Sequence, residues 1–356
     1  MIYGNKGEWS ELYTLFKILS DKVLFAGDSD LNKIENLVFP IIEILRMESG
    51  QLMKFSYDGD IVLIMKNCKQ VKIPISHFTS YSKILFQEIQ NNKRGTFSVA
   101  KIESEINNFG INSIKASSKG KKDISVIIHD ARTGKDQELG FSIKSRLGHP
   151  STLFNAAKTT NFIYKIDNIS PTDDIINSIN SFPKIRDRIN QIVKLGGKFS
   201  YNAIQNSTFE NNLKLIDSSL DYILAAILFI YYSTGTSILS DIIELVKKQN
   251  PLFYNTKENH PYYEYKVKRF LTDTALGMVP GTVWTGDYDA TGGYLIVRED
   301  GEIICYHIYN KAEFENYLLN NTRLDTPSSS RHEFGILYKV NDHFFFNMNL
   351  QIRFKK

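Results

Sequence analysis

Cysteine is scarce in this chain, which contains only two among its 356 residues. Cys68 and Cys305 stand far apart, so the sequence supports neither a disulfide framework nor a zinc ribbon built on Cys-x-x-Cys pairs. We expect both to behave as small buried apolar side chains in a protein of the reducing cytoplasm. The first residues, MIYGNKGEWSELY, also lack the apolar core of a signal peptide.

Long hydrophobic runs are almost absent as well. The longest uncharged run, residues 222–240, has the length of a membrane span. It contains the polar stretch Ser-Thr-Gly-Thr-Ser at 233–237, and Asp221 and Asp241 flank it. This pattern favours a buried helix of a soluble protein that breaks near Gly235.

Neither sign of charge dominates, since 43 Lys and Arg residues face 39 Asp and Glu residues for a net charge of +4. The hydrophobic fraction of 42% is sufficient for a sizeable core, and this excludes disorder on compositional grounds. The length suits one large or two ordinary domains. A near-neutral total is compatible with basic patches beside an acidic centre, which is common in nucleic-acid-binding enzymes.

The N-terminal half predicts a mixture of helices and strands. Apolar side chains recur at helical spacing from Glu8 to Ser20. Residues 31–47 are expected to form a second helix, with Asp30 as its N-cap and a kink at Pro40. We further expect strands at 60–65 and 71–73 and a helix at 81–90.

The second half predicts helices first and short strands later. Helices are expected at 151–164 with Ser151 as N-cap, at 175–195 around Pro183, and through 213–248. Expected strands and one helix follow at 282–288, 293–297, 303–309, 311–319 (the helix), 334–340 and 344–354. A composition change at 196–202 suggests a boundary. The sequence therefore predicts an α/β (α+β) fold with domains 1–200 and 201–356.

One expected hairpin combines an acid, a serine and a lysine. Residues 123–144 read DISVIIHDARTGKDQELGFSIK, with a turn at 133–136 between two strands. If Thr133 and Gly134 centre the turn, Asp123 faces Lys144. Ser142 shares that side of the hairpin, because side chains two positions apart lie on one face of a strand.

These groups are the ones that hydrolysis of a phosphodiester requires. Mg²⁺ takes hard oxygen ligands, polarises the phosphate and lowers the pKa of the attacking water. Asp123 supplies a carboxylate, and the amine of Lys144 can position that water and stabilise developing charge. A serine hydroxyl is a weak metal ligand, so Ser142 leaves the second carboxylate to be found elsewhere.

The N-terminal helix offers that second carboxylate. Glu8 and Glu11 are three residues apart, and both border the apolar arc of a helical wheel drawn at about 100° per residue. A buried carboxylate is costly unless it is paired or bound to metal. Stabilisation of the first turn by the helix dipole explains Glu8 well and Glu11 less well. We favour Glu11, with Glu138 on the second hairpin strand as another candidate.

The segment before the hairpin, residues 115–122, is KASSKGKK and contains four lysines in eight residues. It can be a solvated loop, or a loop that contacts DNA phosphates through Lys119, Lys121 and Lys122. The two readings are about equally supported, because the loop leads directly into Asp123.

The acid, the Ser-x-Lys triplet and the helix segment Lys6-Gly7-Glu8-Trp9-Ser10-Glu11 resemble the PD-(D/E)xK nuclease superfamily. More specifically, the chain resembles the HpaII-type restriction endonucleases. The matching words are NKGEWSELY, FSIKSRLGHPSTLFNAAKTTNF, GGYLIV, CYHIYN, TPSSSRHEFG and NLQIRF, spread over the whole length.

This resemblance implies a nuclease core with a mixed central sheet flanked by helices, followed by a C-terminal α+β region. It implies a type II restriction endonuclease that depends on Mg²⁺ and cuts the palindrome CCGG within both strands. Asp123, Ser142 and Lys144 match the catalytic hairpin of the family. Glu11 matches the helix acid, so Asp123 and Glu11 are the expected metal ligands.

Expected partners follow from this activity. The substrate is double-stranded DNA, and a palindrome calls for a homodimer on DNA. A companion methyltransferase is expected genetically, because an unopposed cutter would damage its own genome. DNA recognition and dimerisation are assigned to the region 201–356, and the nuclease core to 1–200.

Several side chains are candidates for DNA contacts. Guanine edges in CCGG are read best by Arg or Lys, and phosphates by any cation. Arg146 can instead be an ordinary surface arginine, and Arg331 can instead belong to a capped turn. The candidates beyond the connector are Arg146, Asn155, Lys158, Asn161 and Arg331.

Two other functions are kept as alternatives. A structure-selective or repair nuclease can share the same core, although the long C-terminal region argues against a small resolvase. A catalytically inactive DNA-binding protein can retain the fold, although the joint presence of Asp123, Lys144 and Glu11 argues against it.

Overall fold

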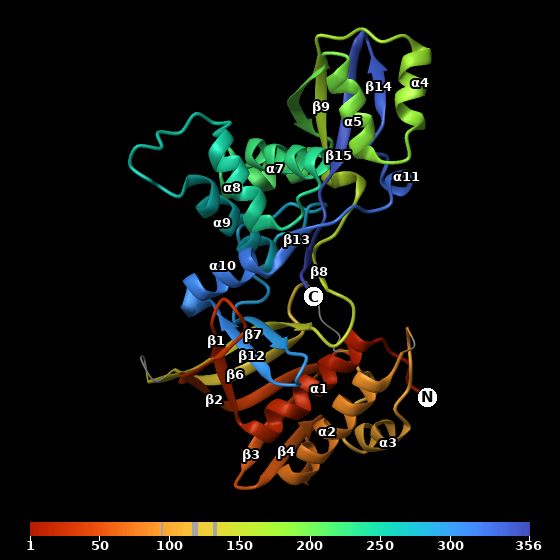
Figure 1. Ribbon diagram of the computed structural model, residues 1–356. Coiled ribbons are helices and arrows are strands. Elements are labelled where there is room, and N and C mark those ends of the chain that lie inside the picture. The colour runs from red at the N-terminus through yellow and green to blue at the C-terminus, as the bar shows by residue number, and fades with distance from the viewer. Residues whose placement is uncertain (94, 116–119, 131–133) are drawn as a thin grey trace.

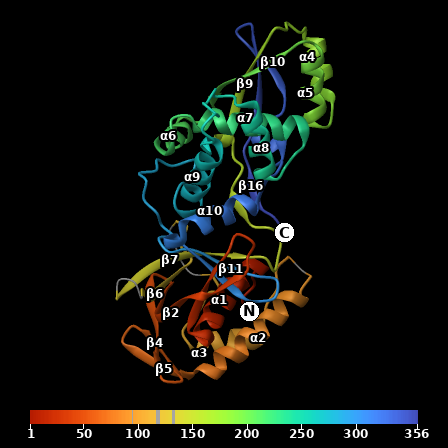
Figure 2. The ribbon, with the colours of Figure 1, turned by 60° about the vertical axis from the view of Figure 1, so that its left-hand side comes forward.

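The computed structural model describes residues 1–93, 95–115, 120–130 and 134–356. Its elements form two groups, one above the other in Figures 1 and 2. The lower group contains a large sheet with helices of the N-terminal segment, and the upper group contains most of the remaining helices. The end of the chain lies where the two groups meet. The α/β architecture expected from the sequence, with a mixed sheet flanked by helices, is confirmed.

The lower group is built on a nine-stranded mixed sheet. Its strands are β1 (Val23–Gly27), β2 (Lys33–Glu48), β3 (Gln51–Asp58), β4 (Ile61–Lys66), β5 (Lys69–Pro74), β6 (Ile124–Asp130), β7 (Lys135–Ser145), β11 (Gly293–Val297) and β12 (Ile303–His307). Their order across the sheet is β1-β12-β11-β7-β6-β2-β3-β4-β5. The pairs β1–β12 and β11–β7 are parallel, and the other neighbours are antiparallel.

Three helices, α1 (Lys6–Asp21), α2 (Ile75–Asn91) and α3 (Ala100–Asn108), pack on this sheet. The first of them is the helix that the N-terminal apolar spacing predicts. A capping box starts α1, because the Asn5 side chain accepts a hydrogen bond from Glu8 N, and the Glu8 carboxylate accepts one from Asn5 N. The helix ends at Lys22, whose φ of 60° is left-handed.

The prediction of a helix at residues 31–47 is wrong. This segment is β2, which pairs with β1, β3 and β6 in the middle of the sheet. Pro40 inside a helix would cost about 3 kcal/mol, whereas here it lies opposite Val23 near a register shift between Ile41 and Glu43. β-branched residues around it favour the strand, and long-range pairing decides between the two. Asp30 therefore caps no helix.

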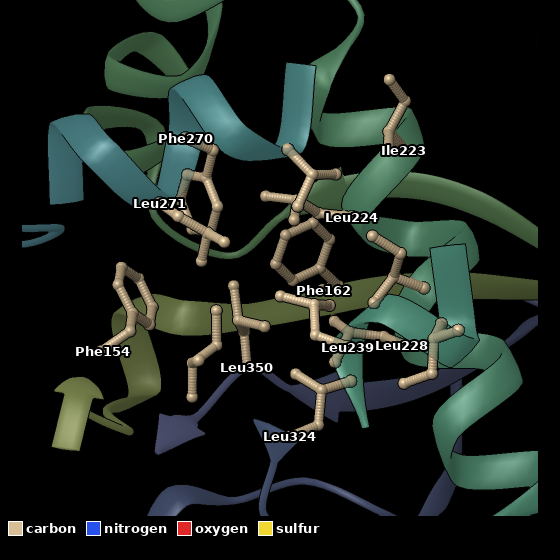
Figure 3. Packing of buried hydrophobic residues seen from close by; sticks show 14 of the residues in the cluster. Phe154, Phe162, Ile223, Leu224, Leu228, Leu239, Phe270, Leu271, Leu324 and Leu350 are labelled. Carbon is tan, nitrogen blue, oxygen red and sulfur yellow. The ribbon is translucent and has the colours of Figure 1, made fainter. Parts of the chain in front are cut away.

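The upper group contains two small sheets and most of the helices. Its strands are β8 (Thr152–Phe154), β9 (Asn161–Asp167), β10 (Lys198–Ile204), β13 (Thr322–Leu324), β14 (Leu337–Val340), β15 (His343–Asn349) and β16 (Ile352–Phe354). Its helices are η1 (Lys158–Thr160), α4 (Asp173–Ser181), α5 (Ile185–Lys194), α6 (Ser207–Ile216), α7 (Leu220–Thr234), α8 (Leu239–Gln249), α9 (Tyr262–Leu276), η2 (Ile308–Asn310), α10 (Lys311–Asn320) and α11 (Ser329–His332). The sheet orders are β10-β9-β15-β14 and β13-β16-β8. Figure 3 shows part of the apolar packing between these helices and strands.

Further expected elements differ from the structure. The helix expected through 213–248 is divided into α6, α7 and α8, and the strand expected at 344–354 into β15 and β16. Residues 151–164, expected to be a helix, form β8, η1 and the start of β9. β9 pairs with both β10 and β15, and this long-range pairing favours the strand over the helix. The strand expected at 282–288 is a loop. The expected strands β4 and β5, the helix pair α4 and α5, and the helix α10 are confirmed.

The apolar helix α7 ends where the sequence predicts a break. Gly235 caps it with a φ of 82°, and a Cβ at this position would collide with the guanidinium of Arg186. Ile223, Ile227 and Leu228 of α7 are completely buried in the upper core. Within the described residues, no helix is long and apolar enough to cross a membrane.

The two groups share the strands β11 and β12, which are buried on both faces. Leu295 and Cys305 face the lower core, whereas Tyr294 and Ile304 belong to the upper core. β11 and β12 come from beyond residue 200 and complete the lower sheet. The boundary expected at 196–202 falls at the start of β10, within the upper group. Cys305 is buried as expected, but the expectation for Cys68 is wrong, since it is exposed in the β4–β5 turn.

A test of this architecture is the substitution Trp9→Ala. Trp9 is completely buried and donates its Nε1 hydrogen to Phe97 O at 3.0 Å. Removing the indole leaves a cavity under α1, so we expect a loss of about 3–5 kcal/mol of unfolding free energy. Denaturant unfolding measures this loss. Leu215→Ala on the exposed side of α6 is the control and should change stability by no more than about 0.5 kcal/mol; equal midpoints for the two variants would contradict the docking of α1.

Candidate active site

The predicted hairpin is formed by β6 and β7, but its register differs from the expected one. Ile124 pairs with Phe141, and continuing this register by one residue sets Asp123 opposite Ser142. The expectation that Asp123 faces Lys144 is therefore wrong by two positions. Thr133, taken as part of the turn centre, lies outside the described residues. A shift of two residues keeps every side chain on its face, so the three side chains still share one side.

Hydrogen bonds join these three side chains in a line. The Ser142 hydroxyl donates to Asp123 Oδ2 at 3.1 Å, and Lys144 Nζ donates to Ser142 Oγ at 3.0 Å. Ile143 N also donates to Asp123 Oδ2 at 2.7 Å. Both of these hydrogen bonds to the carboxylate end on Oδ2, and neither of them involves Oδ1.

The ammonium of Lys144 lies in a closely packed environment. Parallel pairing with β11 brings the Tyr294 ring beneath it, with Nζ 5.2 Å from the ring centroid. Burial lowers the pKa of Lys144, while the negative charges of Asp123 and Glu11 raise it. Two acids from distant parts of the chain thus act on one ammonium. No local pattern in the sequence identifies Tyr294 as a neighbour of Lys144, because its position depends on the β7–β11 pairing.

The two glutamates of α1 have different surroundings. The Glu8 carboxylate belongs to the capping box with Asn5. Glu11 lines a cavity of about 790 Å³ together with Lys144, Lys6 and residues that follow β7. The structure therefore brings Glu11, and not Glu8, to the cavity beside the hairpin.

Glu138 lies too far along β7 to share a ligand with Asp123. It is exposed and pairs with Ile127. Four residues separate it from Ser142, which is about 13 Å at the rise of an extended strand. Among the three acids considered from the sequence, Glu11 is the one that lines the cavity beside Lys144.

The connector before Asp123 is held by a loop from the far end of the chain. Lys121 N donates to Asp289 Oδ2 at 3.1 Å, and a Cβ on Gly120, whose φ is 86°, would lie 2.2 Å from that oxygen. Burial and the nearby charge of Lys144 lower the pKa of Lys121, which Asp289 opposes. Lys121 is therefore close to Lys144 of the hairpin. Lys119 lies outside the described residues, and Lys122 packs its alkyl chain against Gly140.

The other candidates for DNA contacts fall into two places. Arg146 follows β7 and lines a second cavity of about 270 Å³ with Arg298. Lys158 and Arg331 both lie near His332 in the upper group, and Lys158 forms an ion pair with Glu333. Asn155 is exposed on the segment between β8 and η1.

Asn161 differs from these residues because its side chain is completely buried. Its Nδ2 donates to Gln205 Oε1 at 2.8 Å and to His332 O at 2.9 Å. Its Oδ1 accepts a hydrogen bond from Asn349 at 2.7 Å. This amide holds β9, β15 and α11 together and presents no accessible polar atom to DNA.

The donors beside Lys144 fit a hard divalent cation. Within the part of the chain that the structure describes, no group of three or more His, Cys, Asp or Glu side chains has the arrangement of a metal cage. Mg²⁺ does not need such a cage, because it keeps several waters and uses one or two carboxylates plus substrate phosphates. Asp123 and Glu11 are two such carboxylates, and both act on the ammonium of Lys144.

The chain is similar to known proteins over nearly its whole length. A family model described as HpaII restriction endonuclease matches residues 5–354. The type II restriction enzyme HpaII of Haemophilus parainfluenzae is 48% identical over 354 residues, which cover 99% of this chain and 98% of that protein. No solved structure matches the chain. The family resemblance stated from the sequence is confirmed, and the chain belongs to the HpaII restriction endonuclease family.

Proposed function

We propose that this type II restriction endonuclease hydrolyses phosphodiester bonds of double-stranded DNA at CCGG, in both strands and with Mg²⁺ as its metal ion. The observation that carries the active-site assignment is the line Asp123–Ser142–Lys144 beside the cavity that Glu11 lines. Family membership supports the reaction class and the target. In this proposal the β6–β7 hairpin with α1 is a PD-(D/E)xK core.

Each residue of the site has a separate role in this proposal. Asp123 and Glu11 hold the Mg²⁺ ion, and Ser142 fixes Asp123 relative to Lys144 through its two hydrogen bonds. A bound Mg²⁺ supplies polarisation of the phosphate and a lowered pKa for water. Lys144 orients the attacking water and stabilises negative charge on the phosphate.

The reaction needs no group beyond these residues, the metal ion and water. The water oxygen forms a bond to phosphorus, and one P–O ester bond breaks. The departing oxygen ends as an alcohol after taking up a proton, and the other product carries the phosphate. Closely packed surroundings around Lys144 strengthen its interaction with the phosphate, because water screens the charge less there.

DNA contacts are assigned to two clusters of cations. Lys121, Lys122 and Arg146 lie near the hairpin and are proposed to contact phosphates around the scissile bond. Lys158 and Arg331, with Asn155, are proposed to contact DNA from the upper group. The region 1–200 supplies the catalytic acids and lysine, and 201–356 is proposed to provide recognition and dimerisation.

A palindromic target is most simply met by a homodimer on DNA. We further propose that a companion methyltransferase protects the host genome and that the enzyme acts in the cytoplasm. Free Cys68 and Cys305 are compatible with a reducing compartment.

Asp123→Asn and Lys144→Ala are each expected to abolish cleavage and leave specific DNA binding largely intact. The first change weakens a metal ligand and the second removes the cation beside the phosphate. Plasmid digestion with Mg²⁺ measures cleavage, and a mobility-shift assay without Mg²⁺ measures binding. Discrete bands from the wild type support site-specific cleavage. Near wild-type cutting by either variant would refute the active-site assignment, and branched-substrate cutting alone would favour a repair nuclease.

Glu11→Gln is expected to slow cleavage by roughly tenfold or more, because a neutral amide is a poor Mg²⁺ ligand. Glu8→Gln is the matched control. Glutamine can keep the capping box, so this variant should retain α1 and cleave at nearly the wild-type rate. Single-turnover rates at several Mg²⁺ concentrations compare the two, and the reverse ranking would move the metal acid to Glu8.

Ser142→Ala is expected to slow cleavage by roughly tenfold, since it removes hydrogen bonds to one carboxylate and one ammonium, and a bond to a charged group contributes about 1.5–3 kcal/mol. Asp123 keeps its bond from Ile143 N, so activity is reduced and not abolished. Ser125→Ala, at a buried serine of β6, is the control. An unchanged single-turnover rate for Ser142→Ala would show that the serine does not support the site.

A further inference from the structure

A buried ion pair lies beside the proposed active site and has no part in the mechanism above. Arg46 and Glu48 are on β2, with only 3% and 1% of their surfaces exposed. Arg46 Nε lies 3.5 Å from Glu48 Oε2, yet neither atom makes a hydrogen bond within the described part of the chain. Such pairs contribute little net stability, because removing two charges from water costs about as much as their attraction returns.

The location of the pair connects it to the catalytic hairpin. Leu45 of β2 is paired with Ser125 of β6. Arg46 is therefore the next residue along β2, at the level of the start of β6, where Asp123 begins the hairpin. Its side chain lies on the same face of β2 as Ile44, which packs in the core beneath α1.

The pair also holds the backbone that leads into the basic connector. Arg46 Nη2 donates to Ser113 O at 2.6 Å, and Asn112 N donates to Glu48 Oε1 at 2.9 Å. The next residue, Ile114, packs so closely on Gly4 that a Cβ there would lie 2.0 Å from its Cδ1. Contacts thus run without a break from the ion pair to the N-terminal end of α1.

The charges of Arg46 and Glu11 also act on each other, in addition to these contacts. Burial lowers the pKa of Arg46, and the negative charges of Glu48 and then Glu11 raise it. Glu11 acts in the same way on Lys144. Two cations, Lys144 on the hairpin and the buried Arg46 on β2, are therefore close enough to Glu11 to interact with its charge.

We propose that Arg46 is a positioning residue for Glu11: buried on β2, it fixes with Glu48 the segment 112–114, which packs on Gly4 at the start of α1 and so keeps Glu11 at the cavity that Lys144 lines. The proposal rests on the metal-binding role proposed for Glu11. It explains why a costly buried pair is present in the nuclease core, since its contribution is to the position of an acid and not to stability. Lysine is a poor substitute, because only the planar guanidinium reaches Glu48 and Ser113 O together.

The first test replaces both members of the pair with glutamine. Arg46→Gln/Glu48→Gln removes both charges at once and leaves amides that can satisfy Asn112 N and Ser113 O, so the melting temperature should stay within about 4 °C of the wild type. The single-turnover cleavage rate should fall at least tenfold. Titration calorimetry of Mn²⁺ with the enzyme–DNA complex should show at least threefold weaker metal binding. A purely structural role would move the melting temperature without moving metal affinity.

The control is Lys17→Gln/Asp21→Asn, which removes an ion pair at the C-terminal end of α1, the helix that carries Glu11. This variant should cleave and bind Mn²⁺ like the wild type. A wild-type rate together with wild-type Mn²⁺ affinity in Arg46→Gln/Glu48→Gln would overturn the proposal.

A double-mutant cycle keeps the test decisive if the glutamine pair does not fold. Arg46→Lys retains a charge and should slow cleavage at least threefold in the wild-type background. In the Glu11→Gln background it should have no further effect, because Arg46 acts through Glu11. Equal effects in both backgrounds would overturn the proposal. If Glu11→Gln alone cleaves normally while Lys144→Ala is inactive, the role of Glu11 in the proposed function is wrong. This result differs from equal effects of Arg46→Lys in both backgrounds, which would refute only the positioning role of Arg46.

Discussion

The parallel pairing of β7 with β11 is the contact on which the rest of this structure depends. β11 and β12 enter the lower sheet between β1 and β7, although about 150 residues of chain separate β7 from β11 along the sequence. Alternate residues of β11 belong to different cores, since Leu295 packs in the lower one and Tyr294 and Ile296 in the upper one. The two groups are therefore not independent bodies joined by a linker. A disturbance of either core reaches the strand that carries Ser142 and Lys144.

The same pairing sets the electrostatics of the site. Tyr294 contributes an aromatic ring beneath the Lys144 ammonium, and the loop before β11 supplies Asp289, which binds the connector that leads to Asp123. Without these C-terminal residues, the hairpin would stand in water. Charges at that position would then be screened and worth far less to a developing phosphate charge. The proposed recognition of DNA by the upper group and the proposed chemistry in the lower group are thus connected through the shared strands β11 and β12.

Part of the fold and the site could be predicted from sequence because the signals were local. The spacing of Trp9 and Leu12 predicted α1, and the alternation in residues 123–144 predicted both hairpin strands. The two-residue register error has a physical cause: alternation fixes which face a side chain occupies, but a shift by two residues leaves every face unchanged. Only side-chain packing across the sheet decides between such registers. The hairpin face was predictable and the partner of Asp123 was not.

Other features depended on contacts that no local pattern encodes. The β2 segment contains good helix formers such as Glu and Leu, and it becomes a strand because three neighbours pair with it. The amide of Asn161 looked like a base-reading group and proved to be buried between strands. The role of Asp289 and the place of Arg46 likewise depend on distant partners.

Serine at position 142 gives the side chains of the site different roles from those in a site with an acid at this position. An acid at this point would add a third negative charge close to Asp123 and would be free to bind the metal itself. The hydroxyl is neutral and donates to Asp123 while it accepts from Lys144. In the proposed site it therefore orders the two groups without competing for the metal ion, and the ligand that it does not supply is assigned to Glu11 at the cavity. This requirement places unusual weight on the position of Glu11, and a helix side chain is located only as well as the surfaces that hold the helix. A buried arginine that fixes the segment packed on the start of that helix is the kind of support such a site needs, because a side chain on α1 can be no better placed than the helix itself.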